Sequence, residues 1–172
     1  MAPESSNGSG LPDAEQLTAQ LAAMLRPILN ANSALVGIIT GGAWVAEKLG
    51  IILGGKVPTG TLDISFHRDD FEEIGLNKRI KPSSIGFEVT GRDIILVDDI
   101  LHTGRTVRGA MNELFDYGRP ASIKLAILVD RGGRELPVAA DFVAATLSVP
   151  AGMSLDLDRG ADGKLSFSLH PR

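Results

Sequence analysis

Residues 93–106 constrain the fold of this chain more than any other segment. They begin with an apolar run, residues 94–97, that is typical of a buried strand. Two adjacent carboxylates, Asp98 and Asp99, follow where that strand should end, and a Thr-Gly-Arg-Thr turn then opens into a helical pattern. Because ligands of open α/β sheets bind at the carboxyl ends of the strands, this segment predicts a ligand site.

The acidic pair and the turn suit the two ends of a ribose phosphate. Adjacent carboxylates accept hydrogen bonds from sugar hydroxyls or lie beside a divalent cation. The turn offers backbone N–H groups, two hydroxyls and a helix N-terminus, which together suit a phosphate. A buried strand followed by a capping Asp and a polar turn would not explain two charges at a strand end, where desolvation is costly. We therefore expect a ribose-5-phosphate site built from Thr103, Gly104, Arg105, Thr106 and the acidic pair.

The composition indicates a cytosolic, single-domain protein. The chain has 172 residues, 44% of them hydrophobic and 22% charged, which suits one domain with a substantial core. It contains no cysteine, which excludes disulfides and thiolate metal sites, so the cytoplasm is the expected location. No signal-peptide pattern or apolar run of about 18 residues is present, so no membrane association is expected. A net charge of −4 argues against a broad nucleic-acid-coating surface but allows a local basic patch.

Strand and helix patterns alternate along the chain. Residues 1–10 are rich in Ser, Gly, Asn and Pro and are predicted to be a disordered tail, with residues 11–172 as one domain. The alternation predicts an α/β fold, with a parallel core sheet flanked by helices and small remaining elements over its carboxyl edge. The expected helices are one capped by Asp13 and those at 43–49 and 106–117; the expected strands are 35–39, 61–67, 86–90, 122–129, 141–149 and an edge strand at 165–169.

Three further segments are candidates for the same edge. Thr40, Gly41 and Gly42 follow a predicted strand and allow close backbone approach to an anion such as diphosphate, although a plain tight turn explains them as well. Residues 68–82 form a charged arm with four acidic and four basic residues, beginning at Arg68, which either closes over a diphosphate or is a solvated loop.

The third segment is the Arg-rich stretch that follows the strand expected at 122–129. There a planar base could stack on Arg131 or on Phe142, and it could hydrogen-bond to the backbone. A simple turn with Phe142 in the core is an equally good interpretation. The three histidines are far apart in sequence and do not have metal-ligand spacing.

These motifs together resemble one protein family. The segment 93–106 resembles the phosphoribosyl-diphosphate (PRPP) motif of the type I phosphoribosyltransferases. The chain from about residue 35 to 150 is similar to the PyrR family, the pyrimidine-operon regulators with uracil phosphoribosyltransferase activity. The motifs that carry this second resemblance are GTLDI at 60–64, RDD at 68–70, GRPA at 118–121, LVDRG at 128–132, RELP at 134–137 and ADFV at 140–143.

The resemblance implies a type I phosphoribosyltransferase fold with a small hood. It implies the conversion of uracil and PRPP to UMP and diphosphate with Mg²⁺, UMP or UTP as effectors, and a homodimer or higher homo-oligomer. Asp98 and Asp99 would hold the ribose hydroxyls and the metal, and residues 103–106 the 5′-phosphate. The remaining implied contacts are Thr40, Gly41, Gly42 and Arg68 for diphosphate, His102 within the phosphate loop, and Arg131 with the Phe142 and Val143 backbone near the base.

Several positions depart from the pattern that is common in this family. Gly41 stands where many members have Arg, His102 where many have Tyr, and Gly133 where many have His. RNA-binding members carry a His near the position of Ala22. We therefore expect weak or absent specific RNA binding. Two other functions stay open on the sequence: a nucleotide-sensing RNA-binding regulator with little turnover, and a purine phosphoribosyltransferase.

Overall fold

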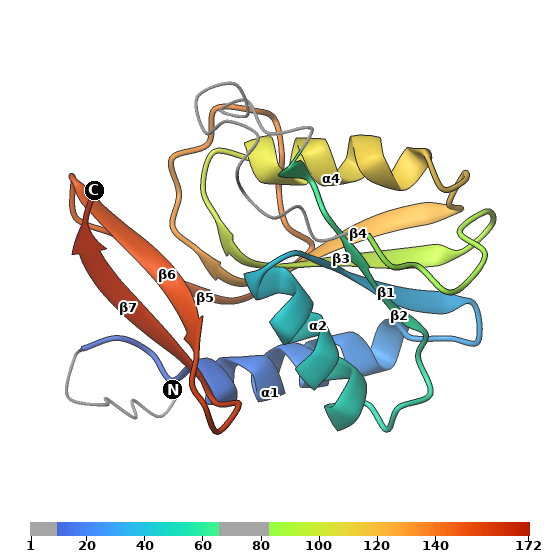
Figure 1. The fold of residues 1–172 in the computed structure, drawn as a ribbon, viewed down its shortest axis with the longest axis horizontal. Coiled ribbons are helices and arrows are strands. Elements are labelled where there is room, and N and C mark those ends of the chain that lie inside the picture. Colours follow the sequence, from blue (N-terminus) through green and yellow to red (C-terminus); the bar gives the residue numbers. More distant parts are fainter. Residues whose placement is uncertain (1–9, 66–82) are drawn as a thin grey trace.

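The computed structural model describes residues 10–65 and 83–172, and a parallel sheet forms its centre (Figure 1). The sheet has five strands in the order β2-β1-β3-β4-β5, all parallel. The strands are β1 (Ser33–Ile38), β2 (Thr59–Leu62), β3 (Asp93–Leu101), β4 (Ser122–Asp130) and β5 (Phe142–Thr146). The predicted α/β fold is confirmed. The expected tail lies outside the described residues except for Gly10, and the charged arm from Arg68 lies outside them entirely.

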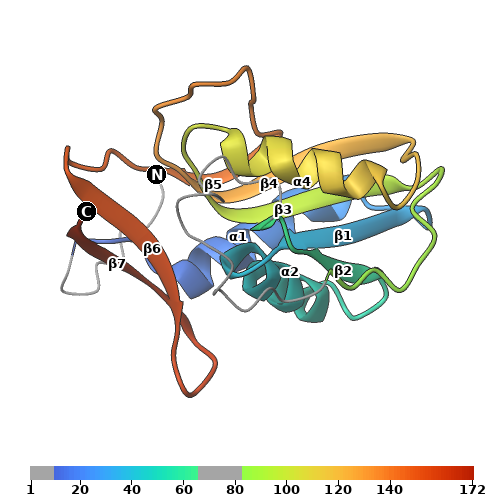
Figure 2. The ribbon, with the colours of Figure 1, turned by 45° about the horizontal axis from the view of Figure 1, so that its top comes forward.

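Helices cover both faces of the sheet, as Figure 2 shows. Helices α1 (Ala14–Leu25) and α2 (Gly41–Ile52) pack on one face, and α4 (Arg105–Phe115) packs on the other. Strands buried on both sides read as continuous apolar runs, which explains the pattern of residues 94–97. Along β3, Ile95 and Val97 join the core under α1 and α2, whereas Ile94 and Leu96 join the core under α4.

Helix α1 begins where the sequence predicts and ends at Leu25, two residues before Pro27. The Asp13 carboxylate caps it, accepting hydrogen bonds from the backbone N–H groups of Glu15 (2.9 Å) and Gln16 (3.2 Å). Pro27 has no N–H to continue the α-helical ladder, so the chain tightens into the short 3₁₀ turn η1 (Arg26–Ile28). None of the helices among residues 10–65 and 83–172 is long and apolar enough to cross a membrane.

Beyond the sheet, the chain ends in an antiparallel hairpin of β6 (Met153–Arg159) and β7 (Leu165–Pro171). The strand predicted at 165–169 is confirmed as β7, which pairs with β6 and not with the main sheet, whereas the sequence gave no sign of β6. The strand expected at 86–90 is wrong, because that stretch forms no ladder. The hairpin buries one face on the core under α1 and α2 through Leu155, Leu157, Leu165 and Phe167.

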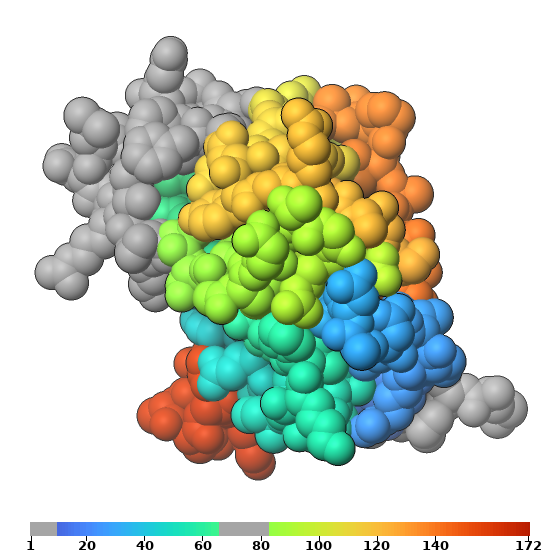
Figure 3. Space-filling view, turned by 90° about the vertical axis from the view of Figure 1, so that its right-hand side faces the viewer, coloured from blue at the N-terminus to red at the C-terminus, as the bar shows by residue number. Residues whose placement is uncertain are grey.

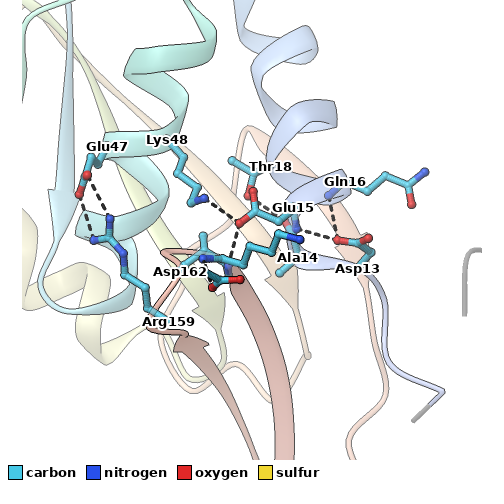
Figure 4. A network of polar contacts seen from close by, with 11 residues as sticks. Asp13, Ala14, Glu15, Gln16, Thr18, Glu47, Lys48, Arg159 and Asp162 are labelled. Carbon is cyan, nitrogen blue, oxygen red and sulfur yellow. Dashed lines mark hydrogen bonds and ion pairs between the residues drawn. The ribbon is translucent and has the colours of Figure 1, made fainter. Parts of the chain in front are cut away.

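Polar contacts fix the turn end of the hairpin to the two helices (Figure 4). Arg159 pairs with Glu47 of α2 at 3.1 Å, and the backbone N–H of Leu165 donates to Glu15 of α1 at 2.7 Å. Lys48 of α2 contacts the same Glu15 oxygen at 2.7 Å. Each exposed ion pair contributes little to stability. The buried apolar side chains of the hairpin therefore supply most of the free energy that holds it against the helices, and the polar contacts fix its orientation.

The amino ends of the strands are closed by connecting loops that pack side by side (Figure 3). Asn32 donates from its side chain to the Gly91 carbonyl at 2.7 Å, and the Gly91 N–H donates to the Arg119 carbonyl at 2.9 Å. These hydrogen bonds join the loops at the amino edge of the sheet. A ligand is expected at the opposite edge, because open α/β sheets bind ligands at the carboxyl ends of their strands.

Candidate functional site

Strands β1 and β3 are neighbours whose following helices diverge. From β1 the chain passes through α2 on one face to β2, and from β3 it passes through α4 on the other face to β4. Such a reversal of direction opens a crevice at the carboxyl ends of the two strands, where open α/β sheets bind their ligands. The segment predicted to bind ribose phosphate lies on one side of this crevice, and the glycine turn lies on the other.

The acidic pair lies where β3 separates from β1, rather than at the end of β3 as the sequence suggested. Pairing with β1 stops at Gly37 and Val97, whereas pairing with β4 continues to Leu101. Asp98 and Asp99 are therefore still in strand conformation, in the part of β3 that pairs with β4 but no longer pairs with β1. The divergence of the two strands gives the carboxylates access to the crevice.

The two carboxylates are deeply set and held by local hydrogen bonds. The Asp98 carboxylate accepts from the Asp99 N–H at 2.9 Å, and the Asp99 carboxylate accepts from the Ile100 N–H at 2.8 Å. Burial nevertheless raises the pKa of Asp99 above its usual value, with the nearby charge of Asp156 adding to that effect. The folded protein thus holds a carboxylate that a cation or hydroxyl donors would stabilise.

The glycine turn packs directly against this acidic pair. A Cβ added at Gly41 would lie 2.1 Å from Oδ2 of Asp99, and one at Gly42 would lie 2.5 Å from the Val97 carbonyl oxygen. Helix α2 begins at Gly41 with Thr40 as its N-cap residue. Because Gly41 and Gly42 have no side chains, the N-terminus of α2 can approach the two carboxylates closely. A plain tight turn would not require so close an approach.

The predicted phosphate loop forms the N-terminus of α4. Gly104 adopts a left-handed conformation (φ 95°) as the N-cap residue, and Arg105 and Thr106 are exposed in the first turn. The Thr103 hydroxyl accepts from the Arg105 N–H at 3.2 Å, and the Thr103 carbonyl accepts from the Glu135 N–H at 2.9 Å. The loop is thus held in place from behind, with the helix N-terminus available to an anion.

Arg134 organises the segment after β4, a role that the sequence did not reveal. Its guanidinium pairs with Asp130 at 2.5 Å and donates to the carbonyl oxygens of His102 (2.7 Å) and Val138 (3.0 Å). Burial opposes ionisation of Asp130, but the hydrogen bonds from Arg134 and from the backbone hold its pKa below the usual value. This one side chain ties the segment to the phosphate loop.

His102 and Arg131 also lie at this edge of the sheet. The His102 Nδ1 lies 2.8 Å from the Gly132 carbonyl oxygen, and its ring fills the space where a side chain at Gly133 would begin. The two departures from the family pattern, His102 and Gly133, are therefore in contact. The Arg131 side chain has a buried Nε with no hydrogen-bond partner among the described residues.

Phe142 and Val143 lie at the beginning of β5, away from its carboxyl end. Phe142 pairs with Ala126, and its ring packs against the core under α1 and α2. This contact favours the core interpretation of Phe142 over base stacking. Arg68, predicted to contact diphosphate, lies outside the described residues.

Other polar residues at the site were not predicted. A third carboxylate, the buried Asp63, follows β2 and accepts from the Ser65 N–H (2.9 Å) and hydroxyl (2.6 Å). The hairpin contributes the Asp156–His170 pair (2.7 Å) and Arg172, whose guanidinium reaches His102 at 3.4 Å. The hairpin residues meet the sheet only through long-range packing, for which their sequence carries no signal.

Known proteins resemble this chain in both sequence and fold. The family described as phosphoribosyl transferase domain matches residues 11–154. A protein of Ralstonia nicotianae named Bifunctional protein PyrR is 44% identical over 167 residues, which cover 93% of this chain and 95% of the relative. A Pseudomonas aeruginosa protein of the same name is 50% identical over 143 residues, covering 81% and 84% of the two chains.

Solved structures share the fold at low sequence identity. A hypoxanthine-guanine phosphoribosyltransferase of Bacillus anthracis superposes with a TM-score of 0.61 at 17% identity, covering 78% of this chain and 79% of the other. A purine phosphoribosyltransferase of Pyrococcus horikoshii gives a TM-score of 0.58 at 23% identity, with 77% and 82% covered. These matches confirm the expected type I phosphoribosyltransferase fold.

Proposed function

The chain belongs to the PyrR family of the type I phosphoribosyltransferases, and from this membership we propose that it converts uracil and PRPP to UMP and diphosphate. One observation carries the proposal: the acidic pair, the glycine turn and the phosphate-type loop meet at the crevice between β1 and β3. A ribose phosphate that carries diphosphate presents hydroxyls, one phosphate and a second anionic group, and the three segments offer a partner for each.

In this proposal, catalysis rests on positioning and charge. The base nitrogen replaces diphosphate at the anomeric carbon through an oxocarbenium-like transition state, so no side-chain nucleophile is required. Asp98 and Asp99 accept hydrogen bonds from the ribose hydroxyls, and residues 103–106 bind the 5′-phosphate. The N–H groups at the start of α2 face the departing diphosphate, where negative charge develops.

The acidic pair also fits a Mg²⁺ ion. Mg²⁺ prefers oxygen ligands and is commonly bound by one or two carboxylates together with substrate phosphates, so two carboxylates suffice. The raised pKa of Asp99 shows that the protein's own hydrogen bonds do not fully compensate the cost of burying its negative charge. A bound cation would stabilise that charge. When bound, the ion would neutralise charge on the diphosphate. Asp98 and Asp99 are the residues proposed to hold it.

The test of the function is PRPP-dependent nucleotide formation against a panel of bases. We expect UMP and diphosphate from uracil, and little product from hypoxanthine, guanine or adenine. Product from a purine but not from uracil would replace this proposal with the purine alternative.

The regulatory alternative predicts tight RNA binding, and we expect weak or absent specific binding to pyrimidine-leader RNA. Ala22 is fully buried, so position 22 presents nothing to RNA. The three basic residues that could form a local patch, Arg26, Arg131 and Arg134, do not form one surface. Arg26 bonds the Ile52 carbonyl (2.9 Å) at the amino edge of the sheet, whereas Arg131 and Arg134 lie at the carboxyl edge.

Filter binding to its own upstream RNA at physiological salt, with and without UMP, measures this expectation. Salt must be fixed because phosphate-dominated binding weakens steeply as salt rises. A specific Kd tighter than roughly 10⁻⁷ M, near the range of specific recognition, would favour the regulator instead.

A further inference from the structure

Two arginine residues lie at the carboxyl edge of the sheet, each directly after a strand. Arg131 follows β4, and Arg172 follows β7 of the hairpin. Burial lowers the pKa of Arg131, and the positive charge of Arg172 lowers it further. A bound anion would offset both effects.

Neither guanidinium forms an ion pair with a carboxylate within residues 10–65 and 83–172. Asp130, beside Arg131, pairs with Arg134, and Asp156 of the hairpin pairs with His170. The buried Nε of Arg131 has no partner in the same part of the chain. Two arginine residues with unused donors thus lie beside the loop that precedes α4, because the Arg131 N–H bonds the Leu101 carbonyl and the Arg172 guanidinium reaches His102.

His102 holds Arg172 in this position. The Gly132 carbonyl can only accept, so His102 Nδ1 at 2.8 Å is the donor, and in the neutral ring Nε2 then carries the lone pair. Arg172 Nη2 lies 3.4 Å from that atom and can donate to it. The Arg172 backbone N–H bonds the Gly152 carbonyl at 2.9 Å, which fixes the residue to the hairpin.

We propose that Arg172, together with Arg131, binds a phosphoryl group of the ribose-phosphate substrate, so that the hairpin completes the site. The inference rests on the proposed function. Guanidinium groups bind phosphate through charge-assisted, often bidentate hydrogen bonds. The two residues lie beside His102, at the start of the phosphate loop, so the 5′-phosphate is the expected partner. Diphosphate could form the same hydrogen bonds with guanidinium groups, so the experiment measures the binding of ribose 5-phosphate and of diphosphate separately.

The test measures binding of ribose 5-phosphate, inorganic diphosphate and neutral uridine by calorimetry. In Arg172→Gln we expect ribose 5-phosphate affinity to fall about tenfold, with uridine affinity unchanged. Arg172→Lys keeps the charge without the planar fork and should recover part of the loss. Lys164→Gln removes the same charge from the exposed hairpin turn and should match the wild type. A loss confined to diphosphate would assign Arg172 to that group instead.

Two outcomes separate this inference from the proposed function. If the wild type forms UMP and a folded Arg172→Gln variant binds both anions like the wild type, the anion role of Arg172 is wrong and the enzyme assignment stands. If the wild type forms no UMP but Arg172→Gln still loses anion affinity, the enzyme assignment fails and the anion site stands. A cooperative thermal transition for each variant establishes that it is folded.

Discussion

Replacing both carboxylates of the acidic pair, Asp98→Asn with Asp99→Asn, is expected to weaken PRPP binding at least tenfold, about 1.4 kcal/mol, and to leave the fold intact. The amides keep the shape of the side chains, and their oxygens can still accept from the Asp99 and Ile100 N–H groups. The substitution removes the negative charge that a metal ion or ribose hydroxyls would meet in the crevice. Calorimetry with PRPP and Mg²⁺ measures the loss.

Stability provides a second readout for this pair, with a defined sign. The pKa of Asp99 is raised in the folded protein, so its ionisation disfavours folding. That penalty is absent below the ordinary value of 3.8 and grows as pH rises toward the raised pKa. Asp99→Asn should therefore increase the free energy of unfolding at neutral pH and leave it unchanged well below pH 3.8.

The control for both readouts is Asp116→Asn, which replaces one exposed carboxylate by an amide at the end of α4, far from the crevice. Unchanged PRPP affinity in the folded double variant would remove the acidic pair from the site. If Asp99→Asn instead lowers the free energy of unfolding at neutral pH, interactions within the protein stabilise the ionised Asp99 carboxylate.

Gly42→Ala is expected to lower the free energy of unfolding by about 1–3 kcal/mol, and to reduce nucleotide formation with it. The new Cβ would lie 2.5 Å from the Val97 carbonyl, which is backbone in the middle of the sheet and cannot turn aside. Helix α2 would have to move away from β3. Chemical denaturation and the UMP assay measure the two effects.

Gly41→Ala should separate function from stability. Its Cβ would meet the Asp99 side chain, at 2.1 Å from Oδ2, and a side chain can rotate at lower cost than backbone can shift. We expect a smaller loss of stability than in Gly42→Ala, with a clear loss of PRPP affinity because the carboxylate is displaced. Gly86→Ala, where a Cβ meets nothing within 4 Å, is the matched control. If Gly41→Ala binds PRPP as Gly86→Ala does, the turn and the acidic pair do not act together.

The sequence sufficed wherever neighbouring residues specify the structure. The apolar run at 94–97 and the Thr-Gly turn predicted β3 and the start of α4, because a strand buried on both faces and a glycine N-cap each leave a local pattern. Asp13 predicted the beginning of α1 for the same reason. The predicted strand at 86–90 failed because a short apolar stretch forms a strand only if a neighbouring strand can pair with it.

The meeting of distant segments came from the tertiary structure alone. The register of β3 between β1 and β4 places Asp98 and Asp99 at the divergence of the strands instead of a strand end. The sequence of the hairpin shows nothing of its contact with the phosphate loop, since Arg172 and His102 are 70 residues apart. Secondary structure follows from local propensity and periodicity, whereas a site at a sheet edge depends on strand order and packing, which only the folded chain defines.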